Sequence, residues 1–314
     1  MAIAVALVGI GQIARDQHVP AIAASGAFEL AATASRNAGV DGVARFADLA
    51  ALLDRRPDIP CISLCTPPQV RHADACRALD AGRHLMLEKP PGATLGEVHD
   101  LVARADARGV TLFATWHSRH ATAVPAAREW LACRRVRRIE IDWKEDVRRW
   151  HPGQEWLWDP GGLGVFDPGV NAISLLDAIH PRALRLTRAE LAFPANRDTP
   201  IAASLELADA DGTGIVAEID WRRQGPQTWD IRVFTDAGDA LLADGGARLV
   251  IDGSEIVAGP APGGTTLDHE YASLYARFAE LVATGASEVH LTPLRLVADA
   301  FLIGRRVTVE PFEW

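Results

Sequence analysis

Lysine is nearly absent from this chain. Among its 32 lysine and arginine residues only Lys89 and Lys144 are lysines, so arginine supplies almost all of the positive charge. Genomic base composition can account for the preference for arginine. The two lysines that remain then mark positions at which arginine is not an adequate replacement. Arginine keeps its proton at neutral pH, whereas lysine can release it, and this difference singles out the two lysines for proton chemistry.

Positive charge as a whole is also scarce. The 41 acidic residues outnumber the 32 basic ones, which gives a net charge of −9 at pH 7. Nucleic acids and anionic membranes both attract a positive surface, so we expect neither as a partner. Individual arginines remain available to bind a phosphate group.

Long apolar runs and paired cysteines are missing as well. No run approaches the roughly 20 apolar residues of a membrane helix, and residues 1–8 show no basic leader segment. None of the four cysteines forms a CxxC pair, and we expect Cys61 and Cys65, in an apolar run, to be buried reduced thiols. The sequence predicts no metal site, and a cytoplasmic location is the default expectation.

The first 119 residues alternate between strand-like and helix-like segments. We expect strands at 3–8, 28–35, 59–65, 84–87 and 110–115, and helices up to residue 24 and at 48–55, 69–81 and 95–108. This alternation predicts a doubly wound parallel sheet with right-handed crossovers, which is a Rossmann domain over residues 1–119.

The pattern changes after residue 120, which predicts a second domain over residues 120–314. Its expected strands lie at 136–147, 186–193, 202–208, 214–222, 229–235, 239–244 and 248–251, and its helices at 168–179, 268–283 and 293–304. Such a run of strands is typical of an α+β domain with a large, mainly antiparallel, open sheet. The outer face of that sheet needs a cover, so we expect a homodimer or homotetramer formed through it.

The best-marked motif is Gly9-Ile10-Gly11-Gln12-Ile13-Ala14, which follows the first strand and opens a helix. Gly9 allows a tight turn, Gly11 lets the backbone approach a pyrophosphate, and Ala14 permits close packing of helix and strand. The amides at the start of the helix attract phosphate. This placement favours a dinucleotide site over a purely structural glycine turn.

The end of the second strand bears on the type of dinucleotide. An NAD site usually carries a carboxylate there for the ribose 2′-hydroxyl, but this strand ends in Ser35-Arg36-Asn37. Arg36 can pair with a 2′-phosphate, assisted by the Ser35 hydroxyl. We therefore expect NADP as the preferred cofactor, with NAD possible; the alternative interpretation makes Arg36 a solvated surface charge.

Two further segments carry a family resemblance. Cys65-Thr66-Pro67-Pro68 follows a strand, with His72 just beyond it, and Glu88-Lys89-Pro90 follows the next strand. Together with the glycine turn they resemble the Gfo/Idh/MocA family of oxidoreductases, over nearly the whole chain. The resemblance implies that the 65–68 segment, His72 and Glu88 lie along the cofactor. It also implies that Lys89 lies near the nicotinamide and the substrate hydroxyl.

The family carries a second motif, Asp-x-x-x-His on a helix, which here reads Asp167-Pro168-Gly169-Val170-Asn171. The spacing places Asp167 and Asn171 on one helix face. Asparagine cannot act as an acid or base, so the substrate proton must pass to Lys89 or to Asp167, and the sequence leaves both open. A third interpretation makes Asp167 only the N-cap of the helix.

This asparagine-bearing pattern resembles the aldose 1-dehydrogenase branch of the family. The resemblance implies oxidation of a cyclic aldose such as L-arabinose, D-galactose or D-fucose at C1, which yields the aldonolactone and passes hydride to the nicotinamide. Asn171 would offer one donor and one acceptor to the sugar hydroxyls. The alternatives are an inositol-type sugar or polyol dehydrogenase of the same family and a cofactor-sensing regulator without catalysis.

Tryptophans and polar residues cluster in one segment of the second domain. Four of the nine tryptophans lie between Trp143 and Trp158, together with Glu145, and aromatic faces pack against the C–H faces of sugars. A lone tryptophan is more often part of a core. We expect the sugar to be bound by Lys89, His117, Glu145, Trp150, Asp167, Asn171 and Trp229, where His117 follows a strand at the carboxyl edge of the parallel sheet.

Overall fold

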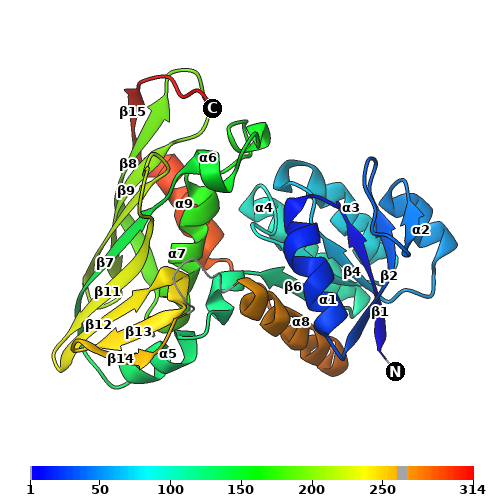
Figure 1. Ribbon diagram of the computed structural model, residues 1–314, viewed down its shortest axis with the longest axis horizontal. Helices are drawn as coiled ribbons and strands as arrows, with labels where there is room; N and C mark the ends of the chain where they lie inside the picture. The colour runs from blue at the N-terminus through cyan, green and yellow to red at the C-terminus, as the bar shows by residue number, and fades with distance from the viewer. Residues whose placement is uncertain (1, 260–266) are drawn as a thin grey trace. The chain divides into compact units, whose positions relative to one another are not determined.

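The computed structural model describes residues 2–259 and 267–314, and these divide into two compact units (Figure 1). The first unit contains residues 2–120 and 267–290, and the second contains residues 121–259 and 291–314. The boundary predicted between residues 119 and 120 lies close to the first change of unit. It assigns residues 267–290 to the second domain, however, whereas the structure places them in the first unit.

The first unit contains a six-stranded, fully parallel sheet in the order β3-β2-β1-β4-β5-β6. Its strands are β1 (Ile3–Val8), β2 (Phe28–Ala34), β3 (Ala44–Phe46), β4 (Cys61–Leu64), β5 (His84–Glu88) and β6 (Leu112–Thr115). The order reverses at β1, which is the doubly wound arrangement predicted from the sequence. Only β3 is not predicted, because three residues are too few to show a strand pattern.

Helices cover both faces of this sheet. They are η1 (Ala14–His18), α1 (Val19–Ala24), α2 (Leu49–Arg55), α3 (Pro68–Asp80), α4 (Leu95–Arg108), η2 (His117–His120) and α8 (Leu267–Thr284). Residues of α2, α3 and α4 form the core on one face, and residues of α1 and α8 form it on the other. A parallel sheet is buried on both faces, so α8 returns to supply a cover that α1 alone does not give.

The second unit contains a nine-stranded sheet in the order β14-β13-β12-β11-β7-β10-β9-β8-β15. Its strands are β7 (Val136–Lys144), β8 (Leu184–Pro194), β9 (Ala202–Asp209), β10 (Gly214–Asp220), β11 (Thr228–Thr235), β12 (Gly238–Ala243), β13 (Arg248–Ile251), β14 (Ser254–Val257) and β15 (Arg305–Val309). The β10–β7 and β15–β8 pairs are parallel and the other pairs are antiparallel. The predicted mainly antiparallel sheet is therefore confirmed, with β14 and β15 as additional edge strands.

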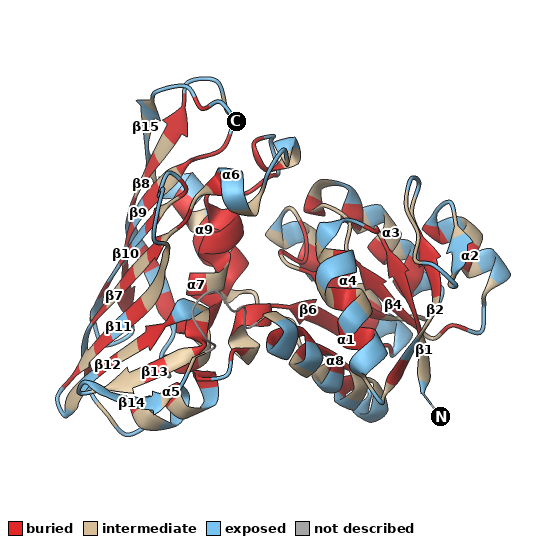
Figure 2. Ribbon diagram, viewed as in Figure 1, coloured by how far each residue is buried: buried red, intermediate tan, exposed pale blue. Residues whose placement is uncertain are grey.

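Helices of the second unit pack on one face of its sheet. The helical segments are α5 (Val124–Leu131), α6 (Val147–Trp150), η3 (Glu155–Leu157), α7 (Phe166–Ile179), η4 (Asp244–Gly246) and α9 (Thr292–Ile303). Helix α7 contacts α5 and α9 as well as strands β7 and β11. Buried and exposed residues alternate along β9 and β10, so the second face of the sheet meets solvent (Figure 2).

The predicted strand over 136–147 is shorter than expected, since β7 ends at Lys144 and α6 begins at Val147. A register shift opposite Thr235 also turns Val136 toward the core and leaves Arg137 exposed, so the regular alternation of the strand breaks at that end. Within the described ranges, no helix combines the length and apolar character needed to span a membrane.

Candidate functional site

The glycine turn after β1 has the backbone geometry that a dinucleotide turn requires. Gly9 has a φ of +86°, and a Cβ atom there would lie 2.8 Å from Thr66 Cγ2 and 2.9 Å from Thr66 N. A Cβ on Gly11, by contrast, would meet nothing within 4 Å, so its backbone faces open space. Ala14 is fully buried against the sheet. Glycine is therefore required at position 9 by contact and conformation, and position 11 leaves room for a ligand.

The Cys65–Pro68 segment lies directly against this turn. The amide of Cys65 donates to the carbonyl of Val8 at 2.8 Å, and Pro67 and Pro68 open helix α3. The Thr66 hydroxyl oxygen is buried and has no hydrogen-bond partner among the described residues. Buried hydroxyls are normally paired, so this one fits a group that hydrogen-bonds a bound dinucleotide beside Gly9.

Ser35 and Arg36 follow the carboxyl end of β2, where the ribose of a dinucleotide is expected. Arg36 is exposed, and Arg45 of β3 lies beside it, because Arg45 Nη2 donates to the Arg36 carbonyl at 3.4 Å. The sequence did not point to Arg45, since β3 itself was not predicted. Two exposed arginines therefore lie at this corner, and their guanidinium groups can pair with an anionic group.

Arg71 is a site residue that the sequence analysis missed. Its guanidinium is buried and donates to the carbonyls of Thr66, Glu88 and Pro90, with a distance of 2.9 Å from Nε to the Thr66 oxygen. Burial lowers the pKa of Arg71 to about 10, against the opposing charge of Glu88. This side chain therefore ties the segment after β4 to the Glu88-Lys89-Pro90 segment after β5, in which the Lys89–Pro90 bond is cis.

His72, for which a position along the cofactor stays a prediction, contacts helix α4 in this structure. Its Nε2 lies 2.9 Å from Asp100 Oδ2, and Cys76 Sγ lies 3.5 Å from each of these two atoms. Within the described residues these three side chains are the one group with metal-ligand character, which sequence spacing did not reveal. Arg104 Nε already donates to Asp100 Oδ2 at 2.9 Å, so we interpret the group as an ion-pair network.

Glu88 is the centre of a buried polar network next to Lys89. Its Oε2 accepts the Lys89 amide at 2.8 Å, and its Oε1 accepts the Tyr271 hydroxyl at 2.6 Å and lies 3.1 Å from His18 Nε2. Burial opposes ionisation of Glu88, but the hydrogen bonds and charge of His18, with Tyr271, hold its pKa at about 2. Glu88 is therefore an ionised, internal support for the Lys89 backbone.

His117 of η2 is almost fully buried in the same unit. Its Nδ1 lies 2.6 Å from Glu270 Oε2, and its ring stacks on Tyr271 with centroids 5.7 Å apart. Glu270 and Tyr271 are neighbours on α8, so one end of this helix contacts both His117 and Glu88. The sequence analysis missed this role of α8, although both tyrosines of the chain, Tyr271 and Tyr275, lie one turn apart on it.

Asp167 and Asn171 lie on α7 in the second unit. The helix begins at Phe166 with Val165 as its N-cap and shows no side-chain cap, so the interpretation of Asp167 as the N-cap is wrong. Asp167 is buried, and Asn171 Oδ1 is buried without a hydrogen-bond partner among the described residues. A buried amide oxygen of this kind fits a site for a hydroxyl donor.

His151, Glu145 and Asp167 form a cluster in the second unit. His151 Nε2 lies 3.5 Å from Glu145 Oε1 and 3.7 Å from Asp167 Oδ2. The Glu145 carboxylate also accepts hydrogen bonds from the indoles of Trp221, at 3.2 Å, and Trp229, at 2.9 Å. Of these residues, His151 and Trp221 were absent from the predicted sugar-binding set.

The predicted tryptophans divide between this cluster and the core. Trp150 meets Trp229 edge to face, with ring centroids 5.4 Å apart, and Trp229 in turn donates to Glu145. Trp143 and Trp158 are almost fully buried in the second unit, in agreement with the core interpretation of a lone tryptophan. The unit therefore presents two carboxylates, an imidazole and indole rings together.

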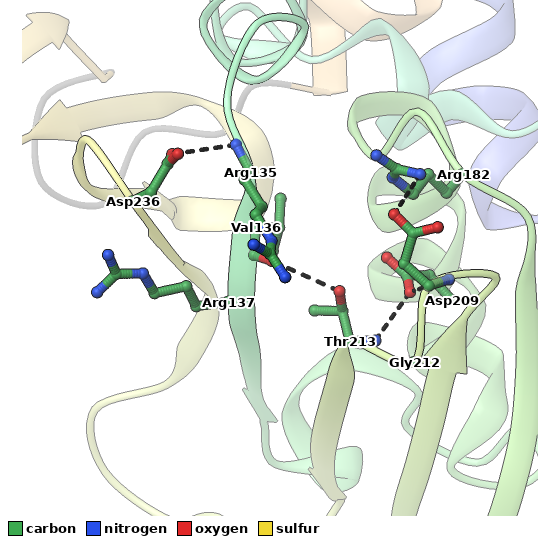
Figure 3. Close-up of a pocket in the computed structure, with 9 residues that line it drawn as sticks. Arg135, Val136, Arg137, Arg182, Asp209, Gly212, Thr213 and Asp236 are labelled. Carbon is green, nitrogen blue, oxygen red and sulfur yellow. Dashed lines mark hydrogen bonds and ion pairs between the residues drawn. The ribbon is translucent and has the colours of Figure 1, made fainter.

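A cavity of about 460 Å³ also opens in the second unit, near the start of β7 (Figure 3). Its charged lining consists of Arg135, Arg137, Arg182, Asp209, Asp211 and Asp236. Three arginines and three aspartates balance in charge, and Arg182 pairs with Asp211. None of the predicted site residues lines this cavity, and its charge favours neither an anion nor a cation.

Three comparisons agree with the geometry. Residues 3–115 match the Gfo/Idh/MocA model of an oxidoreductase family with an NAD-binding Rossmann fold. A galactose 1-dehydrogenase of Pseudomonas fluorescens is 44% identical over 98% of this chain and 97% of that protein. The crystal structure of a D-galactose-1-dehydrogenase from Rhizobium etli has a TM-score of 0.94 at 51% identity and covers 99% of this chain and 98% of that one.

A more distant structure shares the fold alone. A 3-ketoreductase from Actinomadura kijaniata, in complex with NADP and TDP-benzene, has a TM-score of 0.82 at 19% identity and covers 98% of this chain and 100% of that one. The structure contains the parallel sheet, the Gly9 turn and the Glu88-Lys89-Pro90 segment that carried the family resemblance. The chain is also similar over its full length to the two galactose dehydrogenases named above. The chain belongs to the Gfo/Idh/MocA oxidoreductase family, which has an NAD-binding Rossmann fold.

Proposed function

We propose that this protein is an NADP-preferring aldose 1-dehydrogenase that oxidises a sugar of the D-galactose configuration at C1. The observation that carries the proposal is the cluster of Glu145, His151 and Asp167 beside indole rings, because carboxylates bind hydroxyls and indoles pack on sugar C–H faces. Relatives named galactose 1-dehydrogenases, similar over the full chain, add independent support.

The reaction removes a hydride from C1 and a proton from the C1 hydroxyl. When bound, the nicotinamide dinucleotide supplies the hydride acceptor, and Gly9, Gly11 and Thr66 would hold its phosphates. The chain's own residues must orient the sugar and receive the proton. Lys89 is the candidate acceptor, because an amine can take up a proton that neither Asn171 nor arginine can accept.

In this proposal Asp167 and Glu145 accept hydrogen bonds from sugar hydroxyls, and His151 holds the two carboxylates in place. Asn171, whose amide oxygen is buried without a partner among the described residues, accepts a further hydroxyl. L-Arabinose in its pyranose form, D-galactose and D-fucose share the configuration of their ring carbons. A pocket distinguishes weakly between them, because they differ only at the group on C5.

An aldose screen tests this function. We expect NADP reduction, followed by nicotinamide absorbance, with D-galactose, L-arabinose and D-fucose, and a kcat/KM at least about tenfold lower with D-glucose, which differs at C4. myo-Inositol should give no reduction. Inactivity with all three expected sugars, together with reduction by inositol, would replace the proposal with an inositol-type dehydrogenase.

We also propose that Arg36 and Arg45 give the preference for NADP over NAD. Removing one guanidinium from a phosphate site costs about 1.5–3 kcal/mol for a charged hydrogen bond, which is roughly 10- to 100-fold in affinity. Arg36→Ala should therefore raise the Kd of NADP by this factor and change the Kd of NAD by less than about twofold. Calorimetric titration measures both, and Arg185→Ala, at an exposed arginine of the second unit, is the control.

An equal loss of affinity for both dinucleotides in Arg36→Ala would contradict the phosphate assignment.

We further propose a homodimer or homotetramer formed through the solvent-facing side of the nine-stranded sheet. That face carries ion pairs such as Arg138 with Glu140 at 2.9 Å, so the contact would be polar. Analytical ultracentrifugation measures the state, and a monomer at micromolar concentration would contradict it.

A further inference from the structure

Tyr271 connects helix α8, through Glu88, to Lys89, which is the candidate proton acceptor of the proposed function. Its hydroxyl donates to Glu88 Oε1 at 2.6 Å, and the other oxygen of that carboxylate accepts the Lys89 amide at 2.8 Å. A carboxylate is rigid and planar, so a strong hydrogen bond to one oxygen orients the other. The path from the tyrosine hydroxyl to the Lys89 backbone is therefore continuous.

We propose that Tyr271 is a positioning residue, which orients Lys89 through Glu88 and His117 through ring stacking. The inference rests on the proposed function for the role of Lys89. The tyrosine reaches both residues at once, because its ring stacks on His117 at 5.7 Å and 22° while its hydroxyl contacts Glu88. The neighbouring Glu270 holds His117 Nδ1 at 2.6 Å, so α8 fixes that imidazole from two sides.

His18 and Tyr271 contribute differently to the Glu88 carboxylate. His18 is fully buried, and both of its ring nitrogens face oxygens, at 3.1 Å for Glu88 and 2.9 Å for the Tyr275 hydroxyl. That arrangement suits a protonated ring, which balances the charge of Glu88. The Tyr271 hydroxyl makes the shorter contact and stays neutral, since burial raises its pKa well above 10. His18 supplies charge and Tyr271 supplies orientation.

The two tyrosines of the chain provide a matched pair of variants. Tyr271→Phe keeps the stacked ring and removes only the hydroxyl on Glu88. Tyr275→Phe removes an equally buried hydroxyl from the same helix, but one that contacts His18 and not Glu88. Misplacement of a reacting group costs up to about 100-fold in rate. We expect kcat to fall about 10- to 30-fold in Tyr271→Phe, with KM for sugar and NADP within about twofold, and to fall less than about threefold in Tyr275→Phe.

The scarcity of lysine gives a readout that needs no substrate. Protein labelled with ¹³C at lysine Cε shows two signals, and Lys144→Arg identifies the Lys89 signal by elimination. In Tyr271→Phe the Lys89 signal should shift while the Lys144 signal stays in place, whereas in Tyr275→Phe both should stay. If the tyrosines had only a structural role, both variants would unfold at a lower temperature, and the Lys89 signal would not shift in Tyr271→Phe alone.

The outcomes separate the inference from the function on which it rests. If no aldose is oxidised but the Lys89 signal shifts only in Tyr271→Phe, the function is overturned and the positioning stands. If aldoses are oxidised, and Tyr271→Phe keeps the wild-type kcat and an unmoved Lys89 signal, the positioning is overturned and the function stands. Equal changes in the two tyrosine variants also overturn the positioning role.

Discussion

Replacing Lys89 with arginine is expected to lower kcat by about 10³-fold or more, which corresponds to roughly 4 kcal/mol of transition-state stabilisation. The guanidinium keeps the positive charge but cannot accept a proton at neutral pH. The Kd of NADP should change by less than about threefold, because the glycine turn and the Thr66 hydroxyl remain. Steady-state kinetics with D-galactose and calorimetric titration with NADP measure the two quantities.

The second lysine gives the matched control for this substitution. Lys144 lies at the end of β7 and pairs with Asp142 at 2.5 Å, an ion pair that arginine can also make. Lys144→Arg should therefore keep kcat within about twofold of the wild type. If Lys89→Arg retained more than about a tenth of the wild-type kcat, Lys89 would not be the proton acceptor, and Asp167 would be the remaining candidate.

Replacing Asp167 with asparagine is expected to lower kcat/KM for D-galactose by about 10²-fold, with part of the loss in KM. The substitution keeps the size of the side chain and one hydrogen-bonding oxygen, but it removes the charge that faces His151 at 3.7 Å. Charge-assisted hydrogen bonds contribute about 1.5–3 kcal/mol each, so loss of one or two accounts for this factor. Affinity for NADP should not change.

Asp177→Asn, near the other end of α7, controls for effects on the helix itself and should keep kcat/KM within about threefold. The same measurement decides between the two candidate proton acceptors. A loss of kcat in Asp167→Asn as large as that in Lys89→Arg would assign the proton to Asp167, and it would leave Lys89 to bind the C1 hydroxyl.

Local patterns in the sequence predicted much of the fold. The bounds of β1 and α4 agree with the predicted segments to the residue. The signals for these two elements are local: β1 is a continuous apolar run, and α4 lies between a Thr94 N-cap and Gly109. Gly9 follows the same logic, since its left-handed φ and its contact with Thr66 leave no room for a side chain.

Local patterns left the surroundings of other residues open. The alternative interpretation of Asp167 as an N-cap, suggested by the proline that follows it, is wrong because the helix starts at Phe166. The family resemblance places His72 along the cofactor, which stays a prediction, and no local pattern showed that its neighbour Arg71 ties the two loops together. Adjacent positions on a helix face different directions, and only packing against the sheet decides which of them turns inward.

By itself, the sequence determined the parallel sheet, the dinucleotide turn and the scarcity of lysine that draws attention to Lys89. Only the tertiary structure decided which distant residues support them: Tyr271 on Glu88 across 183 positions, Trp221 on Glu145 across 76, and the return of α8 to the first unit. The physical reason is that a strand, a turn or a cap depends on neighbouring residues. A buried carboxylate takes its hydrogen bonds from whichever donors the packed core brings within reach.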